Sequence, residues 1–146
     1  MGKYSYETCR PFVGFHSTQQ DFETFEPGVG GAQFHVGTAS QATMRGGHSG
    51  SVLLRVSVYA TALIRKKDIS GGGWKRPTAK EADAADGVVY LNRFEGIPPE
   101  RFNALGGLSI ESMSDAEFRK RVPEARDSYG IFQPHNCRII ERISWG

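Results

Sequence analysis

His16 is the residue whose type and surroundings point most directly to chemistry. It follows a short apolar segment, Val13-Gly14-Phe15, and precedes two small hydroxyl residues, Ser17 and Thr18. A histidine followed by two such residues has no obvious packing role. This order indicates the end of a strand that delivers an imidazole into a cleft. Considered alone, His16 is better explained as a structural histidine that caps a strand or loop.

Two other histidines stand where a metal ligand could be sought, His48 in Gly-Gly-His-Ser-Gly and His135 in Gln-Pro-His-Asn. Neither has a carboxylate or a cysteine at ligand spacing, so we expect surface histidines in loops and no metal site. The glycine-rich segment 46–50 lacks the Gly-Lys-Ser/Thr ending of a P-loop. Cys9 and Cys137 also lack metal-type spacing, and we expect free thiols in a reducing compartment.

Length and composition indicate one domain with a hydrophobic core. The chain has 146 residues, of which 38% are hydrophobic. Its formal net charge of +2 is too small to indicate nucleic acid as the main partner. No apolar run approaches the roughly 18 residues of a membrane span, and the first residues have no apolar signal-peptide core. We therefore expect a cytoplasmic protein without a membrane partner.

Short strands must position these side chains. Apolar runs rich in β-branched and aromatic residues predict strands at 12–15, 33–36, 51–64, 88–92, 129–132 and 138–143. The run 51–64 is the longest. Helices are predicted at 38–45, 78–85 and 114–121, since each begins with Thr or Ser as a potential N-cap. Glu81 and Glu117 complete capping boxes in the last two. The pattern predicts an α+β domain with a mostly antiparallel sheet.

Four phrases stand out when the chain is followed in order. They are Phe15-His16-Ser17-Thr18 with Asp21, Phe22 and Phe25; Gln33-Phe34-His35-Val36-Gly37-Thr38; Asp86-Gly-Val-Val-Tyr-Leu-Asn-Arg-Phe-Glu95; and Asp127-Ser-Tyr-Gly-Ile-Phe-Gln-Pro134. A long strand-like stretch, 53–68 followed by Trp74, separates the second from the third. Their order and spacing resemble the ADP-ribosyltransferase fold, and more narrowly its small bacterial and phage members in toxins and polyvalent phage proteins. The resemblance covers nearly all of residues 1–146 and implies a split, mostly antiparallel sheet with a few short helices.

Two departures from the family pattern affect the expected site. Residues 96–126 are longer than the resemblance leads us to expect, and we interpret them as a possible inserted segment that contacts a substrate. Many enzymes of this fold carry a Glu directly before the Tyr of the last phrase, where this chain has Ser128. The catalytic carboxylate is therefore either Glu95 or Asp127. Antiparallel pairing of 88–92 with 129–132 would bring Asp127 close to Glu95.

The resemblance implies NAD as a substrate whose nicotinamide–ribose bond is broken through an oxocarbenium-like transition state. His16 would hydrogen-bond an adenosine-ribose hydroxyl, and the Ser17 backbone would clamp the nicotinamide carboxamide. His35 would stack on the nicotinamide while Phe34 faces the core. Glu95 would hold the ribose 2′-hydroxyl and stabilise the cation. The implied NAD-binding residues are His16, Ser17, Thr18, Phe34, His35, Thr38 and Asn92. The implied catalytic residues are His16, His35, Glu95 and Asp127.

Three of these positions keep a second interpretation. Glu95 either serves as the catalytic carboxylate or is a solvated residue at the end of a strand. Thr38 either contacts the ligand or serves only as the N-cap of the following helix. Asn92 either supports the site through hydrogen bonds or only turns the chain.

The function that the resemblance implies is mono-ADP-ribosyl transfer, a glycosyltransferase reaction, in a toxin, an effector or a phage counter-defence protein. A protein acceptor is favoured and a nucleic-acid acceptor is possible. Two alternatives remain open from the residues. One is an NAD glycohydrolase, in which water takes the place of the acceptor. The other is a binding module that keeps the fold without catalysis, an alternative that Ser128 and His35 keep open.

Overall fold

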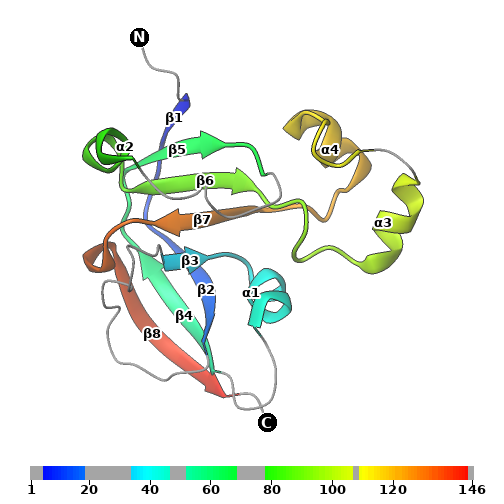
Figure 1. The fold of residues 1–146 in the computed structure, drawn as a ribbon. Helices are drawn as coiled ribbons and strands as arrows, with labels where there is room; N and C mark the ends of the chain where they lie inside the picture. Colours follow the sequence, from blue (N-terminus) through cyan, green and yellow to red (C-terminus); the bar gives the residue numbers. More distant parts are fainter. Residues whose placement is uncertain (1–4, 19–33, 47–51, 69–77, 107–108, 145–146) are drawn as a thin grey trace.

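The computed structural model describes residues 5–18, 34–46, 52–68, 78–106 and 109–144. In these ranges the chain forms two β-sheets and a few short helices (Figure 1). The expected α+β class is therefore confirmed. Some residues that the sequence analysis named lie outside the described ranges, namely Asp21, Phe22, Phe25, His48 and Trp74.

The first sheet has five strands in the order β1-β5-β6-β7-β3. Their bounds are Ser5–Thr8, Ala62–Lys66, Gly87–Leu91, Asp127–Ile131 and Phe34–Val36. Only β5 and β6 pair in parallel; the other neighbours are antiparallel. The second sheet is antiparallel, in the order β2-β4-β8, with bounds Phe12–Thr18, Val52–Val58 and Cys137–Ser144. The prediction of mostly antiparallel strands is confirmed, including the pairing of β6 with β7.

The three predicted helices are present and begin where their capping residues predicted. They are α1 (Ala39–Gly46), α2 (Ala79–Ala84) and α4 (Asp115–Arg121). Three further short elements were not predicted: strand β1, helix α3 (Pro99–Leu105) and the 3-10 turn η2 (Pro134–Asn136). Among the described residues, no helix has the length and apolar character needed to cross a bilayer.

The prediction of one long strand at 51–64 was wrong. The structure divides this run between β4 and β5, which belong to different sheets. The corner is fixed by Asp86, whose carboxylate accepts hydrogen bonds from the backbone N–H groups of Thr61 (2.8 Å) and Ala62 (3.2 Å). Because this carboxylate comes from a distant part of the chain, the apolar run alone could not reveal the break.

The main core lies between the two sheets. Leu54, Val56 and Val58 of β4 pack with Val89 of β6 and Ile131 of β7. A second apolar cluster belongs to residues 91–125, around Phe118 and Leu105 of the two helices α3 and α4. Figure 1 shows these helices projecting together beyond the ends of β6 and β7. We call this projection, residues 96–126, the α3–α4 lobe.

The two sheets meet at one backbone bridge between Phe15 and Gly37. Each residue's N–H donates to the other's carbonyl, at 2.8 and 3.0 Å. Gly14 permits this approach, because a Cβ built there would lie 2.3 Å from Cγ1 of Val36. The bridge brings the strand that carries His16 against the strand that carries His35.

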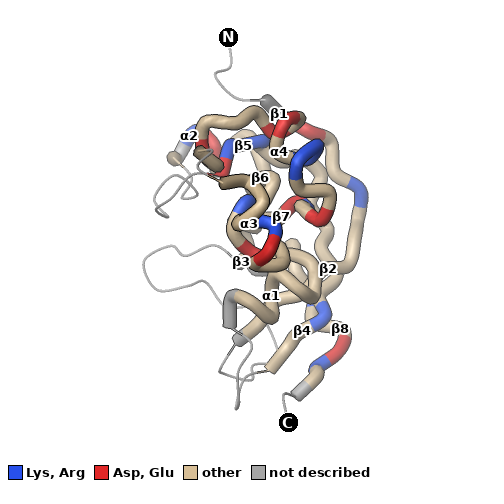
Figure 2. Tube along the Cα trace, turned by 90° about the vertical axis from the view of Figure 1, so that its right-hand side faces the viewer, with Lys and Arg blue, Asp and Glu red and all other residues tan. Residues whose placement is uncertain are grey.

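Charged residues of both signs are interspersed over α4, β5 and β7 (Figure 2). Arg65 donates to Asp127 at 2.8 and 3.0 Å and to Glu7 at 2.6 and 3.0 Å. Arg119 of α4 also reaches Asp127, at 3.3 Å. The arginines on this side of the molecule are therefore largely neutralised by carboxylates.

Helix α2 is held by a buried carboxylate. Glu81 is 1% exposed. It accepts a hydrogen bond from the Thr78 backbone at 2.9 Å and forms an ion pair with Lys66 at 3.1 Å. Burial acts to raise the pKa of Glu81, but the hydrogen bonds with Thr78 and the charge of Lys66 outweigh it and lower the pKa below the ordinary 4.5.

Replacement of Glu81 by Gln should lower the free energy of unfolding at pH 7 by on the order of 1–3 kcal/mol, since a charged hydrogen-bond acceptor is lost. A carboxylate with a lowered folded pKa stabilises the fold above its unfolded pKa, and that stability is lost as the pH falls through the folded value. The difference between wild type and Glu81→Gln should therefore shrink below pH 4.5. Urea unfolding at neutral and acidic pH measures it, with Glu141→Gln as an exposed control. A difference independent of pH would contradict this assignment.

Candidate functional site

His16 is held at the junction of the two sheets. Its register partner in β4 is Leu54, which belongs to the core. Directly opposite residues of an antiparallel pair point to the same side of the sheet, so the imidazole of His16 faces inward toward β3. Nδ1 lies 2.6 Å from the backbone carbonyl of His35. Because a carbonyl only accepts, Nδ1 carries the proton in this bond.

His35 is positioned by a buried tyrosine. Its register partner in β7 is Gly130, which pairs in turn with Val88 of β6. The side chain of His35 therefore shares a face of the sheet with Tyr90 and Ser128. Nε2 of His35 forms a hydrogen bond with the Tyr90 hydroxyl, and the two rings are tilted by 58° with centroids 5.8 Å apart.

The other residues of these two strands are partly described. Ser17 pairs with Leu53 in the ladder between β2 and β4. The side chains of Thr18 and Phe34 lie outside the described part of the structure. Their predicted contacts with NAD and with the core stay predictions.

Glu95 is fixed in a turn that Asn92 organises at the end of β6. The Asn92 carboxamide oxygen accepts hydrogen bonds from the backbone N–H groups of Phe94 (3.0 Å) and Glu95 (2.9 Å). Its amide nitrogen donates to Oε1 of Glu95 (2.9 Å) and to Oγ of Ser128 (3.0 Å). Asn92 thus does both things that the sequence left open: it turns the chain and it holds the carboxylate.

Ser128 connects this turn to helix α1. Its hydroxyl donates to Oε1 of Gln41 at 2.8 Å, and the same oxygen accepts from the Thr38 backbone N–H at 2.9 Å. The Gln41 amide donates to the carbonyl of Arg126 at 3.0 Å. Gly37 leaves room for this contact, since a Cβ there would lie 2.3 Å from Oε1 of Gln41. We call the three side chains of Gln41, Ser128 and Asn92, all at most 2% exposed, the buried amide network.

Sequence reasoning missed Gln41, although a signal for it was present. Thr38 and Gln41 have the Thr-x-x-Gln spacing of a capping box. In the structure the Thr38 hydroxyl oxygen accepts from the Gln41 backbone N–H at 3.1 Å. Thr38 is therefore the N-cap of α1. A contact of Thr38 with NAD remains a prediction.

Asp127 points away from this arrangement. Successive side chains of a strand alternate between faces, so Asp127 lies on the opposite face of β7 from Ser128. Its carboxylate is engaged by Arg65 and Arg119. Although β6 and β7 pair as expected, with Leu91 opposite Asp127, the two candidate carboxylates are directed differently. Glu95 is joined to Ser128 through Asn92, and Asp127 is not.

Arg93 is a second residue that sequence reasoning missed. It is fully buried, and its guanidinium donates to the carbonyls of Ile110 (2.6 Å) and Met113 (2.7 Å) and to Asp115 (2.6 Å). It also lies 5.1 Å from the centre of the Phe118 ring. Arg93 therefore anchors the α3–α4 lobe two residues before Glu95.

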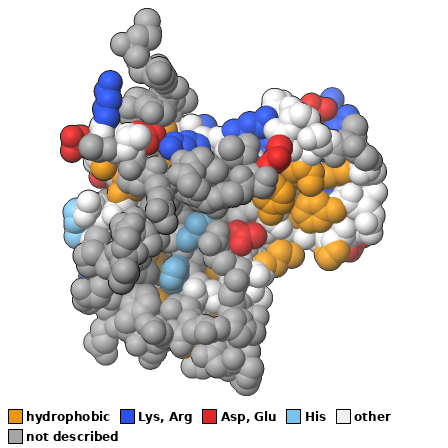
Figure 3. All heavy atoms as spheres, viewed as in Figure 1, with side chains coloured by type: hydrophobic (Ala, Val, Ile, Leu, Met, Phe, Trp, Pro, Cys, Tyr) orange, Lys and Arg blue, Asp and Glu red, His pale blue; other side chains and the backbone are white. Residues whose placement is uncertain are grey.

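Figure 3 shows histidine side chains near the middle of one face of the molecule, with an acidic side chain beside them and hydrophobic side chains gathered over the α3–α4 lobe. His135 lies apart from these residues in η2 and is exposed. In the ranges that the structure describes, no group of three or more His, Cys, Asp or Glu could hold a metal ion.

Comparison of the chain with protein-family models, with curated proteins and with solved structures produced no match. The functional argument therefore depends on the residues and their geometry.

Removal of the Ser128 hydroxyl should destabilise the fold by about 1–3 kcal/mol, because buried polar atoms of Asn92 and Gln41 each lose a partner. Urea unfolding of Ser128→Ala measures the loss. Ser112→Ala is the control, since that hydroxyl is exposed. Equal stabilities of the two variants would show that the network contributes nothing.

Arg93→Lys should loosen the α3–α4 lobe, because an ammonium cannot reproduce the fork of the guanidinium. We expect amide hydrogen exchange in α3 and α4 to accelerate about tenfold or more, from loss of at least one charged hydrogen bond, while β6 changes less. Arg121→Lys, on the exposed side of α4, is the matched control. Uniform acceleration across both sheets would instead indicate global destabilisation.

Proposed function

We propose that this protein is a mono-ADP-ribosyltransferase that uses NAD as a substrate. It cleaves the bond between nicotinamide and ribose and transfers ADP-ribose to a macromolecular acceptor. The proposal combines the resemblance of the ordered phrases with the arrangement of the residues in them. In this proposal the protein acts in the cytoplasm of a bacterial or host cell, as a toxin, an effector or a phage counter-defence protein.

One observation carries the proposal. A continuous series of contacts joins His16 to the backbone of His35 and the His35 ring to Tyr90. Tyr90 is the register partner of Ser128, which Asn92 links to Glu95. Residues separated by almost eighty positions are thus held together on one side of the molecule. His16 supplies an imidazole that can hydrogen-bond, His35 a ring that can stack, and Glu95 a fixed carboxylate. These are the groups that NAD cleavage requires.

In the proposed reaction the bond from the ribose C1′ to the nicotinamide nitrogen breaks, and the electron pair leaves with nicotinamide. Positive charge develops on the ribose, as in glycoside hydrolysis. Glu95 stabilises that charge and holds the 2′-hydroxyl. The acceptor nucleophile then bonds to C1′ and releases its proton to Glu95 or to solvent. Charge stabilisation by preorganised groups is usually the largest catalytic term.

Glu95 is preferred over Asp127 as the acid. The Glu95 carboxylate is oriented by Asn92 on the Ser128 side of β7, whereas Asp127 is bound by two arginines on the other side. Ser128, at the position where a catalytic Glu is common in the resembling family, acts here as a positioning residue within the buried amide network.

A protein acceptor is preferred over nucleic acid. Binding to a phosphate backbone depends on cationic side chains. Arg93 and the arginines of the α3–α4 lobe are largely occupied by acids, in the pairs Arg93–Asp115, Arg101–Glu124, Arg119–Asp127 and Arg121–Glu117. Directly before Glu95 the exposed Phe94 offers apolar surface instead, and hydrophobic side chains gather over the lobe (Figure 3). This surface suits contact with a protein.

The test is nicotinamide release from NAD by the purified chain, followed by mass spectrometry of proteins and nucleic acids from a lysate. Glu95→Gln should lower the rate of nicotinamide release at least about 100-fold. His16→Ala should mainly raise KM, by roughly tenfold for one lost hydrogen bond. Glu100→Gln, an exposed carboxylate on α3, should retain activity.

Each other outcome identifies a different function. Equal release of free ADP-ribose with and without lysate would indicate an NAD glycohydrolase. Failure of the wild type to bind millimolar NAD in calorimetry would support a non-catalytic binding module. Full activity of Glu95→Gln would exclude Glu95 as the acid, and Asp127→Asn would be examined next.

A further inference from the structure

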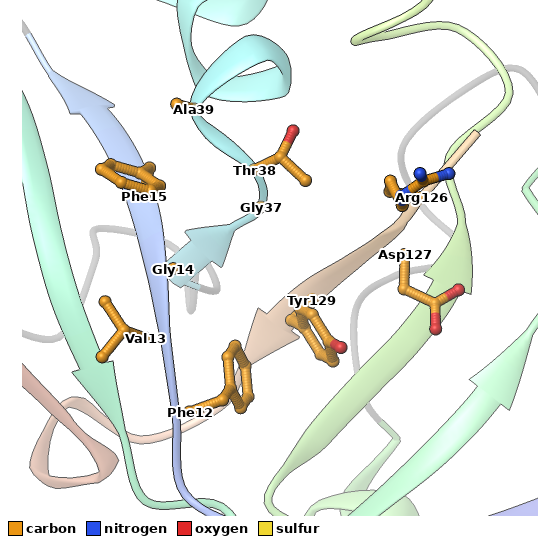
Figure 4. Close-up of a pocket in the computed structure, with 10 residues that line it drawn as sticks. All are labelled: Phe12, Val13, Gly14, Phe15, Gly37, Thr38, Ala39, Arg126, Asp127 and Tyr129. Carbon is orange, nitrogen blue, oxygen red and sulfur yellow. The ribbon is translucent and has the colours of Figure 1, made fainter. Parts of the chain in front are cut away.

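A pocket lies on the face of β7 opposite Ser128. It measures about 440 Å³ and is lined by residues 12–15 of β2, the junction 37–39 between β3 and α1, and Arg126, Asp127 and Tyr129 at the start of β7 (Figure 4). Asp127 and Tyr129 line it, and strand alternation directs both away from the face of Ser128 and His35. Its volume is within the range of roughly 300–1,000 Å³ that is usual for small-molecule sites. The pocket therefore lies on the other face of β7 from Ser128 and His35, and Thr38 is the one lining residue that is also an implied NAD contact.

Aromatic rings form the walls of this pocket. The rings of Phe12 and Tyr129 lie 4.4 Å apart between centroids and are tilted by 38°. Val13 and Phe15 line the pocket from the other face of β2, since Phe15 pairs with the exposed Arg55 whereas Phe12 pairs with the buried Val58. Aromatic rings prefer offset or tilted contact with other rings, so these walls suit a planar ring.

The polar groups at the rim are mainly hydrogen-bond donors. The Asp127 carboxylate is already bound by Arg65 and Arg119. Arg126 is exposed, and its Nη1 donates to the carbonyls of Pro123 and Ala125. That leaves its Nε and Nη2 without a bond to any residue that the structure describes. A guanidinium can only donate, and its flat fork matches a carboxylate or phosphate.

Two hydroxyl groups reinforce this preference. The oxygen of Thr38 accepts from the Gln41 backbone, and its O–H can still donate. Burial raises the pKa of Tyr129 to about 12, so its phenol stays protonated at neutral pH. Asp127 carries the one carboxylate among the lining residues, and it is paired with the guanidinium groups of Arg65 and Arg119, whereas Nε and Nη2 of Arg126 stay unoccupied by any described residue. An anionic group is therefore favoured over a cationic one.

We propose that this pocket binds an aromatic ring that carries a carboxylate or a phosphate. The ring lies against Phe12 and Tyr129, and the anionic group is bound by Arg126. This assignment does not depend on NAD cleavage, because His16, His35 and Glu95 do not line the pocket.

The test uses three probes: phenylpropionate, its neutral amide and phenyl phosphate. They are titrated into the ¹⁵N-labelled full chain, and affinities are measured by NMR and calorimetry. We expect shift changes at residues 12–15, 37–39 and 126–129, and binding of the acid about tenfold or more tighter than that of the amide, the usual effect of one charged hydrogen bond. The carboxylate and phosphate arms identify which anion the site prefers.

Two variants examine the anion contact. Arg126→Gln should weaken binding of the anionic probe roughly tenfold, whereas Arg138→Gln, an exposed arginine on β8, should not change it. Ala39→Glu places a carboxylate at the rim, where the first turn of α1 tolerates negative charge, and should abolish binding in a folded protein. Glu95→Gln should leave probe binding unchanged, which separates this pocket from the NAD site.

Three results would overturn the proposal. The first is no binding of either anionic probe at ~10 mM, a concentration above the millimolar affinities of weak small ligands. The second is equal affinity for the acid and its amide. The third is unchanged binding of the anion by both Arg126→Gln and Ala39→Glu.

Discussion

The buried amide network is the interaction on which the rest of the arrangement depends. Gln41, Ser128 and Asn92 come from a helix, a strand and a turn, and each satisfies its partners where water cannot do so. Buried polar groups are costly unless they are hydrogen-bonded, and a fully satisfied network specifies one geometry. Here that geometry fixes the start of α1, the end of β6 and the direction of the Glu95 carboxylate. The glycines beside it follow from the same constraint, since Gly37 and Gly96 both approach Gln41 closely.

Arg93 extends this order into the α3–α4 lobe. A buried guanidinium is costly unless it is paired and hydrogen-bonded. The two terminal nitrogens of Arg93 bond to two carbonyls and to Asp115, while its Nε has no hydrogen-bond partner among the described residues. Its backbone N–H is bound in turn by Asp68 at 2.8 Å. The lobe is thereby attached to the same turn that holds Glu95. Any partner that contacts the lobe is brought close to that carboxylate, whatever reaction it performs.

The parts of the fold that depend on local signals could be predicted. The starts of α2 and α4 were predicted from their capping residues, Thr78 with Glu81 and Ser114. The apolar runs predicted most strands. Features that depend on distant residues could not be predicted. The break between β4 and β5 requires the Asp86 carboxylate, and the burial of Arg93 requires carbonyls that lie seventeen and twenty positions away. Within the candidate site, the residue types and their order in the sequence indicated His16, His35 and Glu95. The role of Gln41 could not be predicted in the same way, because it depends on the contacts between α1 and β7.

Alternation along β7 explains how one short strand can contribute to the two sites proposed above. Ser128 belongs to the side that carries His35 and Tyr90, and the neighbouring Asp127 and Tyr129 belong to the pocket side. A shift of register by one residue would exchange these sets and would place a charged side chain in the buried amide network. The register of β7 must therefore be firmly fixed, and side-chain hydrogen bonds on both faces of the strand fix it. Ser128 is bound by Asn92 and Gln41 on one face, and Asp127 is bound by Arg65 on the other. The ion pairs of Asp127 thus have a structural reason that is independent of catalysis.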